Sequence, residues 1–138
     1  MTTHKQIYVN LAIKDMARTQ VFYRQLGFEF DAKFSNEQGA CLVVGEHIFV
    51  MLLVESFFKG FISEKSIVDA KQSTEALICI SCESRAEVDD LVARAVAAGG
   101  TSPRTPVDHG FMYMHGFEDL DGHIWELMYM NADAAPNA

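Results

Sequence analysis

The sequence predicts an α+β fold in which one unit, a strand followed by a helix and three strands, occurs twice in tandem. Each half of the chain opens with a short apolar run and a helix-like segment. Three short strand candidates separated by turn residues follow each helix, a pattern typical of hairpins. At 138 residues the chain has the length of one domain. We therefore expect a single domain of two modules.

The first module is expected over residues 6–54. An apolar run at 6–14 predicts its first strand, and Asp15 is placed to cap a helix over 16–26 that Gly27 ends. The three strands after the helix are expected at 28–34, 40–44 and 48–54.

The second module, over residues 74–130, repeats this plan. A strand at 75–82 leads to Ser84 as the cap of a helix over 86–98, which Gly99 ends. Its other strands are expected at 101–107, 111–117 and 124–130. In the closing hairpins, His47 aligns with His123 and Val50 with Glu126. We interpret this sequence similarity between the two halves as an internal repeat.

The connector between the modules spans residues 55–73 and carries three phenylalanines before a polar, helix-compatible stretch at 63–70. These phenylalanines could form a lid over a pocket, a plug in a dimer interface, or one face of a short helix packed on the domain edge. The tail at 131–138 is rich in alanine and asparagine, and we expect it to be disordered.

Composition favours a cytoplasmic protein. Acidic residues outnumber basic ones for a net charge of −8, and no basic cluster offers a footprint for a nucleic acid. The longest apolar stretch, 48–54, is far shorter than the roughly 20 residues that a membrane helix needs. The N-terminus lacks the apolar run of a signal peptide. We expect neither nucleic acid nor a membrane as a partner.

The chain holds three cysteines, Cys41, Cys79 and Cys82. The last two have C-x-x-C spacing, which could mean a redox pair or half of a zinc site. Their segment, 76–82, has the composition of a buried strand, and no second ligand pair follows at zinc spacing. This favours small core residues in a reducing compartment.

Two stretches resemble a known family. Residues 9–28 read VNLAIKDMARTQVFYRQLGF, and residues 117–127 read FEDLDGHIWEL, with Leu120 where the family has proline. They resemble the opening and closing motifs of the vicinal-oxygen-chelate superfamily of glyoxalases, bleomycin-resistance proteins and dihydroxybiphenyl dioxygenases. A bacterial branch related to lactoylglutathione lyases is the most similar. The resemblance implies two βαβββ modules in a half-open antiparallel cup, with helices outside and pairing as a homodimer.

The resemblance also implies a divalent metal, held by the first and last strands of each module. Counting from the helix caps places these ligand positions at Tyr8 and Leu77, and the internal alignment places the others at Val50 and Glu126. Glu126 alone is a good ligand. A metal is therefore possible but disfavoured, with Glu126 as its ligand if one binds, and no other cofactor is expected.

Glu126 is the main functional candidate. A carboxylate facing a cavity could anchor a ligand or act as a base, although it could also be a buried structural residue or a metal ligand. His115 could be a proton shuttle or a half-exposed strand residue. The residues expected to bind substrate are Tyr8, Asn10, Met51, Phe111, Tyr113 and His115. Strand alternation puts the last three on one face, and the pattern leaves open which face lines the cavity.

The resemblance and the Glu126 candidate lead to two functional hypotheses. The first is an enzyme resembling glyoxalases or dioxygenases, which binds a small oxygenated metabolite in the cup and transfers a proton at Glu126. The ligand positions argue against glyoxalase I activity itself. The alternative is a metal-independent protein similar to bleomycin-resistance proteins, which sequesters a cationic drug in an acidic dimer cleft. A regulatory or structural domain is the third possibility.

Overall fold

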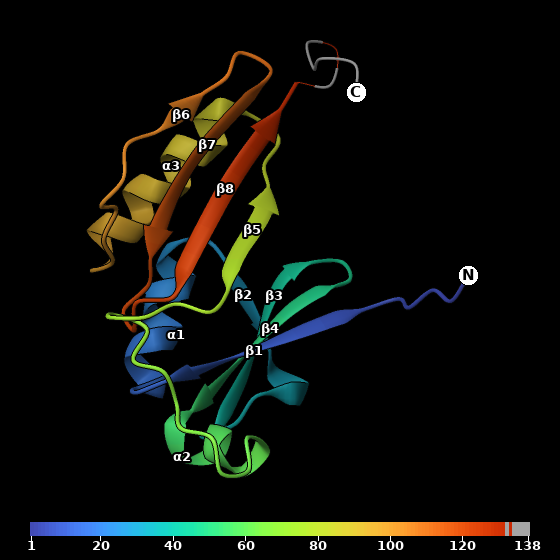
Figure 1. Cartoon of the computed structure of the whole chain (residues 1–138), viewed down its shortest axis with the longest axis vertical. Coiled ribbons are helices and arrows are strands. Elements are labelled where there is room, and N and C mark those ends of the chain that lie inside the picture. Colours follow the sequence, from blue (N-terminus) through green and yellow to red (C-terminus); the bar gives the residue numbers. More distant parts are fainter. Residues whose placement is uncertain (132, 134–138) are drawn as a thin grey trace. The chain divides into compact units, whose positions relative to one another are not determined.

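The computed structural model describes residues 1–131 and 133 (Figure 1). The chain divides into two compact units, Met1–Val68 and Asp69–Ala138, and the boundary falls inside the predicted connector. Each unit contains one four-stranded sheet, and neither sheet is closed. The predicted disorder at 131–138 falls mostly on residues outside the described ones. Among the described residues, no helix has the length and apolar character needed to cross a membrane.

The first unit is a mixed sheet with strand order β1-β4-β3-β2. β1 and β4 pair in parallel, whereas β4 with β3 and β3 with β2 are the antiparallel hairpins that the sequence predicts. A 3-10 turn at Ala32–Phe34 shortens the strand predicted at 28–34. The elements are β1 (Ile7–Ile13), α1 (Met16–Gln25), β2 (Glu29–Asp31), β3 (Gly39–Gly45) and β4 (Ile48–Val54).

Helix α1 begins and ends where the sequence predicts. The Asp15 carboxylate accepts a hydrogen bond from the Arg18 backbone N–H at 3.0 Å, and Gly27 takes the positive φ of 96° that ends the helix. Phe22 and Tyr23 on α1 are fully buried. They belong to a core with the buried strand residues Ile13, Leu42, Val50 and Leu52.

The connector is mostly irregular. Its phenylalanines lie on two short turns of helix, α2 (Glu55–Phe58) and a 3-10 turn at Lys59–Phe61, and the Phe57 and Phe61 rings meet edge to face at 5.3 Å. The helix-compatible stretch at 63–70 is turn and irregular backbone instead. Ser63 there has a positive φ of 54°, which interrupts a right-handed helix.

The second unit repeats the plan with strand order β5-β8-β7-β6. β5 and β8 pair in parallel, and the other two pairs are antiparallel. Most of the strand predicted at 101–107 is absent, because Pro103 and Pro106 have no N–H to donate to a ladder. The elements are β5 (Leu77–Ser81), α3 (Arg85–Ala97), β6 (Val107–Asp108), β7 (Met112–Glu118) and β8 (Ile124–Met130).

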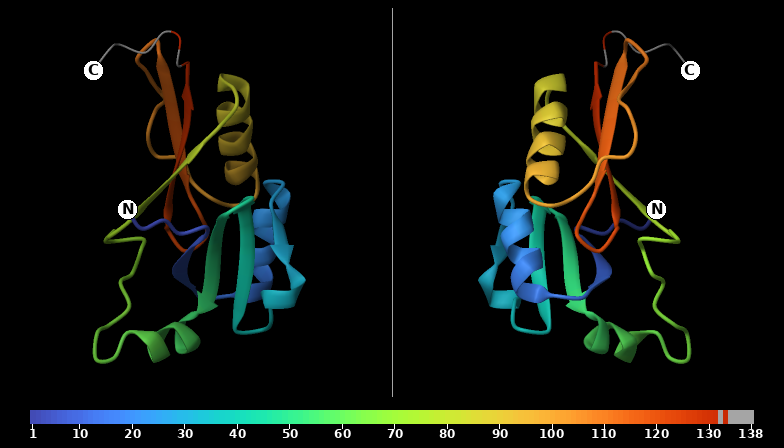
Figure 2. Two further views of the ribbon diagram at one scale, coloured as in Figure 1. Left: turned by 90° about the vertical axis from the view of Figure 1, so that its right-hand side faces the viewer. Right: turned by 90° about the vertical axis from the view of Figure 1, so that its left-hand side faces the viewer.

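The two faces of the second sheet differ in character. Phe117, Trp125 and Leu127 are almost completely buried on the side that α3 covers (Figure 2). Side chains alternate along a strand, so their neighbours project from the opposite side, which we call the open face. The open face carries Leu77, Cys79, Met114, Gly116, Ile124 and Glu126, which are paired across the strands.

Hydrogen bonds connect the hairpin of β6 and β7 to α3. The Arg85 guanidinium donates to both Asp108 carboxylate oxygens, at 2.7 and 3.1 Å, and to the Gly110 carbonyl at 3.0 Å. The Tyr113 hydroxyl donates to the Asp89 carboxylate at 2.6 Å. Hydrogen bonds from Arg85, and then from the Gly110 backbone, lower the pKa of Asp108 from 3.8 to about 2.

The pair of Arg85 and Asp108 predicts that the stability of the fold depends on pH in the acid range. A carboxyl whose pKa is lower in the folded state stabilises the fold above pH 3.8, and this contribution disappears as the pH falls toward 2. We expect Asp108→Asn to lower the melting temperature by a few degrees at neutral pH and to leave it nearly unchanged near pH 2. Thermal unfolding followed by circular dichroism measures the difference. The exposed acid Glu83, changed to Gln, is the control, and an equal effect of Asp108→Asn at both pH values would contradict the prediction.

Candidate functional site

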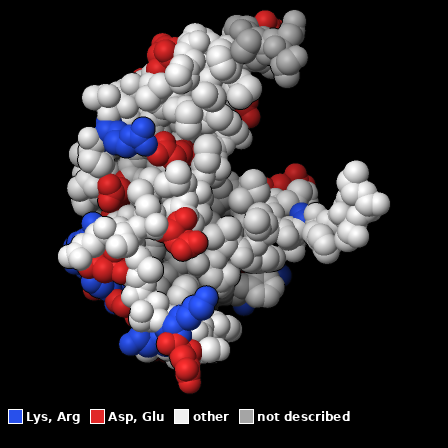
Figure 3. All heavy atoms as spheres, viewed as in Figure 1, with Lys and Arg blue, Asp and Glu red and all other residues white. Residues whose placement is uncertain are grey.

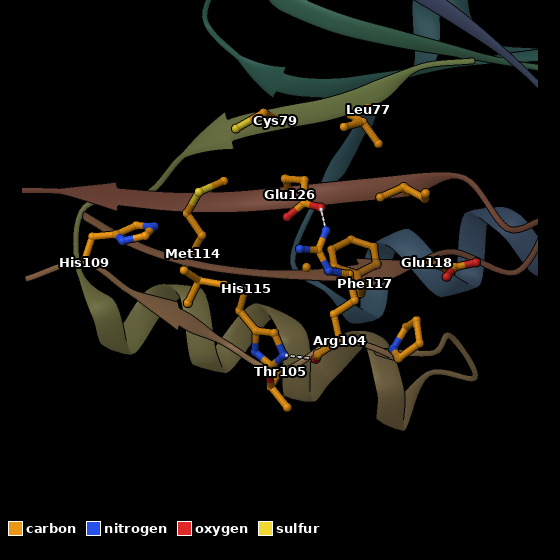
Figure 4. A pocket seen from close by; sticks show the side chains of 14 residues that line it. Leu77, Cys79, Arg104, Thr105, His109, Met114, His115, Phe117, Glu118 and Glu126 are labelled. Atoms are coloured by element: carbon orange, nitrogen blue, oxygen red, sulfur yellow. Dashed lines mark hydrogen bonds and ion pairs between the residues drawn. The ribbon is translucent and has the colours of Figure 1, made fainter. Parts of the chain in front are cut away.

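A pocket of about 440 Å³ lies on the open face of the second unit (Figure 4). This volume is within the roughly 300–1,000 Å³ typical of small-molecule sites. β5 and β8 supply Leu77, Cys79, Ile124 and Glu126 to its lining, and residues 103–107 supply a second wall. Its surface is mainly apolar, with a few charged groups. Every lining residue belongs to the second unit.

Glu126 is one of the two acidic residues that line this pocket, the other being Glu118. The Glu126 side chain is only 15% exposed, and its Oε1 lies 3.6 Å from Nη1 of Arg104. At that separation the two groups form an ion pair without a hydrogen bond. Within the described part of the chain, the Glu126 carboxylate accepts no hydrogen bond. Glu126 is therefore a half-buried carboxylate with free acceptor capacity.

Gly116 makes room for this carboxylate. It lies directly opposite Glu126 in the register of β7 and β8. A Cβ at this position would lie 2.7 Å from the Trp125 carbonyl oxygen and 3.0 Å from Oε2 of Glu126. Glycine is thus required by close approach and not by a positive φ.

His115 contacts the backbone of the segment that carries Arg104. Its Nε2 lies 3.0 Å from the Arg104 carbonyl oxygen, which can only accept, so Nε2 carries a proton. The same Nε2 lies 3.1 Å from Oγ of Ser102, whose hydroxyl donates to the Gly116 carbonyl at 2.7 Å. His115 therefore lines the pocket as a fastener of the 102–105 segment, and this arrangement gives no support to a proton shuttle.

The pocket takes residues of β7 from both faces of the strand. Met114 and Gly116 share the open face with Glu126, whereas His115 and Phe117 alternate with them. Of the predicted set of Phe111, Tyr113 and His115, only His115 lines the pocket. Phe111 precedes β7, and its ring stacks on His109 at 6.4 Å. Tyr113 is directed to Asp89 on α3 instead.

The other predicted substrate residues lie in the first unit. The Tyr8 ring stacks on Phe49 at 4.9 Å, and the Asn10 amide donates to the Tyr8 carbonyl at 3.2 Å. Met51 is the register partner of Asn10. These side chains share the face of the first sheet opposite its buried core. None of them lines the pocket that contains Glu126.

The internal alignment of Val50 with Glu126 is wrong by one residue. Val50 is 1% exposed and belongs to the core side of its sheet. The parallel pairs Tyr8–Phe49 and Leu77–Ile124 are equivalent, which makes Met51 the counterpart of Glu126. The turn before β4 is residues 46–47 and the turn before β8 is residues 119–123, so the aligned histidines in these turns do not mark equivalent strand positions.

The residues at the family's metal positions do not fit a divalent metal. Leu77 has no donor atom, and the Met51 thioether is a soft, weak ligand. Glu126 is paired with the Arg104 guanidinium. In the described ranges, no three His, Cys, Asp or Glu side chains gather where they could hold a metal ion. We therefore derive no chemical step through a metal.

The cysteines are all free thiols. Cys41 and Cys82 are buried, which confirms the core interpretation for them. Burial, and then the Glu87 carboxylate, raises the pKa of Cys82 to about 11. Cys79 is exposed on the open face beside Glu126, so the core interpretation is wrong for Cys79. Burial, and then the negative charge of Glu126, raises its pKa.

Arg104 is the residue that sequence reasoning missed. It lies in a segment without regular structure, where no periodicity indicates which way a side chain points. The prolines at 103 and 106 offered one signal, because they predict an irregular edge whose side chains could turn toward the sheet.

The fold agrees with what sequence comparison finds. A family model described as the Glyoxalase/Bleomycin resistance protein/Dioxygenase superfamily matches residues 5–127. The chain belongs to this superfamily, as its opening and closing motifs predict. A comparison with curated proteins gave no match.

Solved structures support the same fold. A hypothetical protein from S. aureus is 25% identical over 93% of this chain and 95% of its own, with a TM-score of 0.78. A glyoxalase-related enzyme from Fulvimarina pelagi is 21% identical, covering 91% of this chain and 88% of its own, with a TM-score of 0.75. The fosfomycin resistance protein FosX from Listeria monocytogenes is 19% identical, covering 99% and 96%, with a TM-score of 0.66. The last two show the fold alone.

The close approach at Gly116 predicts a penalty for any added side chain. We expect Gly116→Ala to destabilise the protein by about 1–3 kcal/mol, because its Cβ would force the Trp125 backbone and the Glu126 carboxylate to move. Urea unfolding measures this change. Gly60→Ala is the matched control, because a Cβ there meets nothing within 4 Å. If both variants were equally stable, the sheet would tolerate the Cβ and the prediction would be wrong.

Proposed function

We propose that this chain binds a small organic molecule in the pocket of the second unit, with Glu126 as its anchor and without a metal. The observation that carries the proposal is the half-buried Glu126 carboxylate, which lies among apolar walls and accepts no hydrogen bond within the described residues. No described side-chain oxygen is both buried and without a partner, so the Glu126 oxygens still reach solvent, and a ligand that donates to them replaces water with a charge-assisted hydrogen bond. The pocket therefore favours ligands with a donor or cationic group and an apolar body.

A base that transfers a proton would use the same carboxylate. We place the anchor first, because this carboxylate already pairs with a cationic group, the Arg104 guanidinium, at 3.6 Å. The metal-independent sequestration of a cationic drug is a special case of this anchor, favoured by the net charge of −8. Conversion of a bound ligand would distinguish an enzyme from a sequestering protein. Pairing as a homodimer stays a prediction.

Cys79 provides a direct measurement of binding. It is the exposed cysteine beside Glu126, whereas Cys41 and Cys82 are buried, so a maleimide should label Cys79 first. We expect phenethylamine, a cation with an aromatic body, to slow this labelling in proportion to its occupancy. Mass spectrometry of the labelled peptide then gives the dissociation constant.

Glu126→Gln should weaken phenethylamine binding at least about tenfold, because a charge-assisted hydrogen bond is lost. Glu83→Gln, which removes the same charge from an exposed position, should leave it unchanged. Excess EDTA should also have no effect. The proposal fails if phenethylamine gives no protection at about 10 mM, or protects the Glu126→Gln variant equally. Loss of binding in EDTA would overturn its metal-independent part.

A further inference from the structure

The ion pair in the pocket leaves unused hydrogen-bonding capacity on both partners. Arg104 and Glu126 are separated by 3.6 Å, beyond hydrogen-bond distance. The Arg104 guanidinium donates no hydrogen bond to any described residue, and the carboxylate accepts none. A guanidinium has five donors and a carboxylate has about four acceptor sites. A positive and a negative group therefore lie next to each other, and neither makes a side-chain hydrogen bond to a described residue.

The two partners differ sharply in exposure. The Arg104 side chain is 74% exposed, whereas that of Glu126 is 15% exposed. An ion pair with one partner in solvent contributes little to stability, so separating it is inexpensive. Figure 4 shows Arg104 reaching across the pocket from the 103–107 wall toward Glu126 on β8. A ligand can therefore enter by displacing the Arg104 head.

The backbone beneath Arg104 is fixed even though its head is exposed. His115 donates to the Arg104 carbonyl at 3.0 Å, and Ser102 donates to the Gly116 carbonyl at 2.7 Å. Thr101 and Glu118 exchange two backbone hydrogen bonds, of 3.0 and 2.7 Å. These contacts connect residues 101, 102 and 104 to β7. Movement is thus confined to the side chain, which stays within reach of the pocket.

The charges around the pocket restrict the ligand further. Two carboxylates line it, Glu118 and Glu126, against the single arginine. A purely anionic ligand would meet this excess of negative charge, whereas a purely cationic one would leave Arg104 without a partner. A ligand with both charges satisfies both groups. Because the Arg104 backbone is held close to Glu126, the two charged groups of such a ligand must lie close together, as they do when both are attached to one carbon atom.

We propose that Arg104 is an anion-recognition residue and that the ligand class of this pocket is an α-amino acid or a similar compact zwitterion with an apolar side chain. The ligand's ammonium group binds Glu126, its carboxylate binds the displaced Arg104 head, and its apolar part lies against Leu77, Met114 and Ile124. This inference rests on the proposed function, because it needs Glu126 as the anchor. It adds the second contact that sets specificity.

Three probes that share a phenylethyl group test the inference. L-phenylalanine carries both charges, phenethylamine only the cation, and hydrocinnamate only the anion. We expect L-phenylalanine to protect Cys79 at a concentration at least about tenfold lower than either other compound, because it adds a second charge-assisted contact. Arg104→Gln should remove this advantage, leaving phenethylamine binding unchanged or tighter. Arg94→Gln, with the same charge change on α3, is the control.

The outcomes separate this inference from the proposed function. If L-phenylalanine and phenethylamine bind equally well to the wild-type protein, or if Arg104→Gln weakens both equally, anion recognition by Arg104 is wrong. Phenethylamine binding that still depends on Glu126 would leave the proposed function intact in that case. If no probe depends on Glu126, both proposals fail. No binding of L-phenylalanine at about 10 mM would also overturn the inference.

Discussion

The burial of Trp125 and Leu127 constrains the rest of the site, because it fixes which way β8 faces. Both side chains have no exposed area, and they lie on the side of the sheet that α3 covers. Alternation then forces Glu126, between them, onto the open face. A register shift of one residue would expose the tryptophan and bury the carboxylate, so the apolar core selects the orientation of the functional group. Gly116 opposite Glu126 completes this selection, since a larger residue would clash with it.

The fold could be predicted because its signals are local and repeated. Asp15 and Ser84 accept the capping hydrogen bonds that their positions predict, and Gly27 and Gly99 take positive φ angles. Less of the pairing could be predicted. The first strand of each unit pairs in parallel with the last, a long-range choice that no turn signal records. The irregular path at 101–107 has a plain cause in its two prolines, which have no N–H to donate to a strand ladder.

The site could be predicted only in part, because faces depend on the register and loops have no periodicity. Glu126 lines the pocket because its motif lies on a regular strand, and its role there stays a prediction. Tyr113 and His115 were placed by alternation alone, and alternation does not say which face is covered by a helix. Arg104 is on an irregular segment, where tertiary contacts from His115 decide its position. The error at Val50 came from aligning His47 with His123, which lie in turns of different length.

The two units show how a repeated fold can carry different chemistry. At equivalent positions on the open faces, the first unit has Met51 and the stacked pair of Tyr8 and Phe49. The second has Glu126 and Ile124, with an arginine supplied from outside the sheet. Core positions must stay apolar in both units, because both sheets pack against a helix. Open-face positions are free of that requirement, so one unit can keep a polarised pocket while the other keeps an aromatic surface. The charge pair is therefore a property of one module and its loop, and the backbone plan common to both modules does not dictate it.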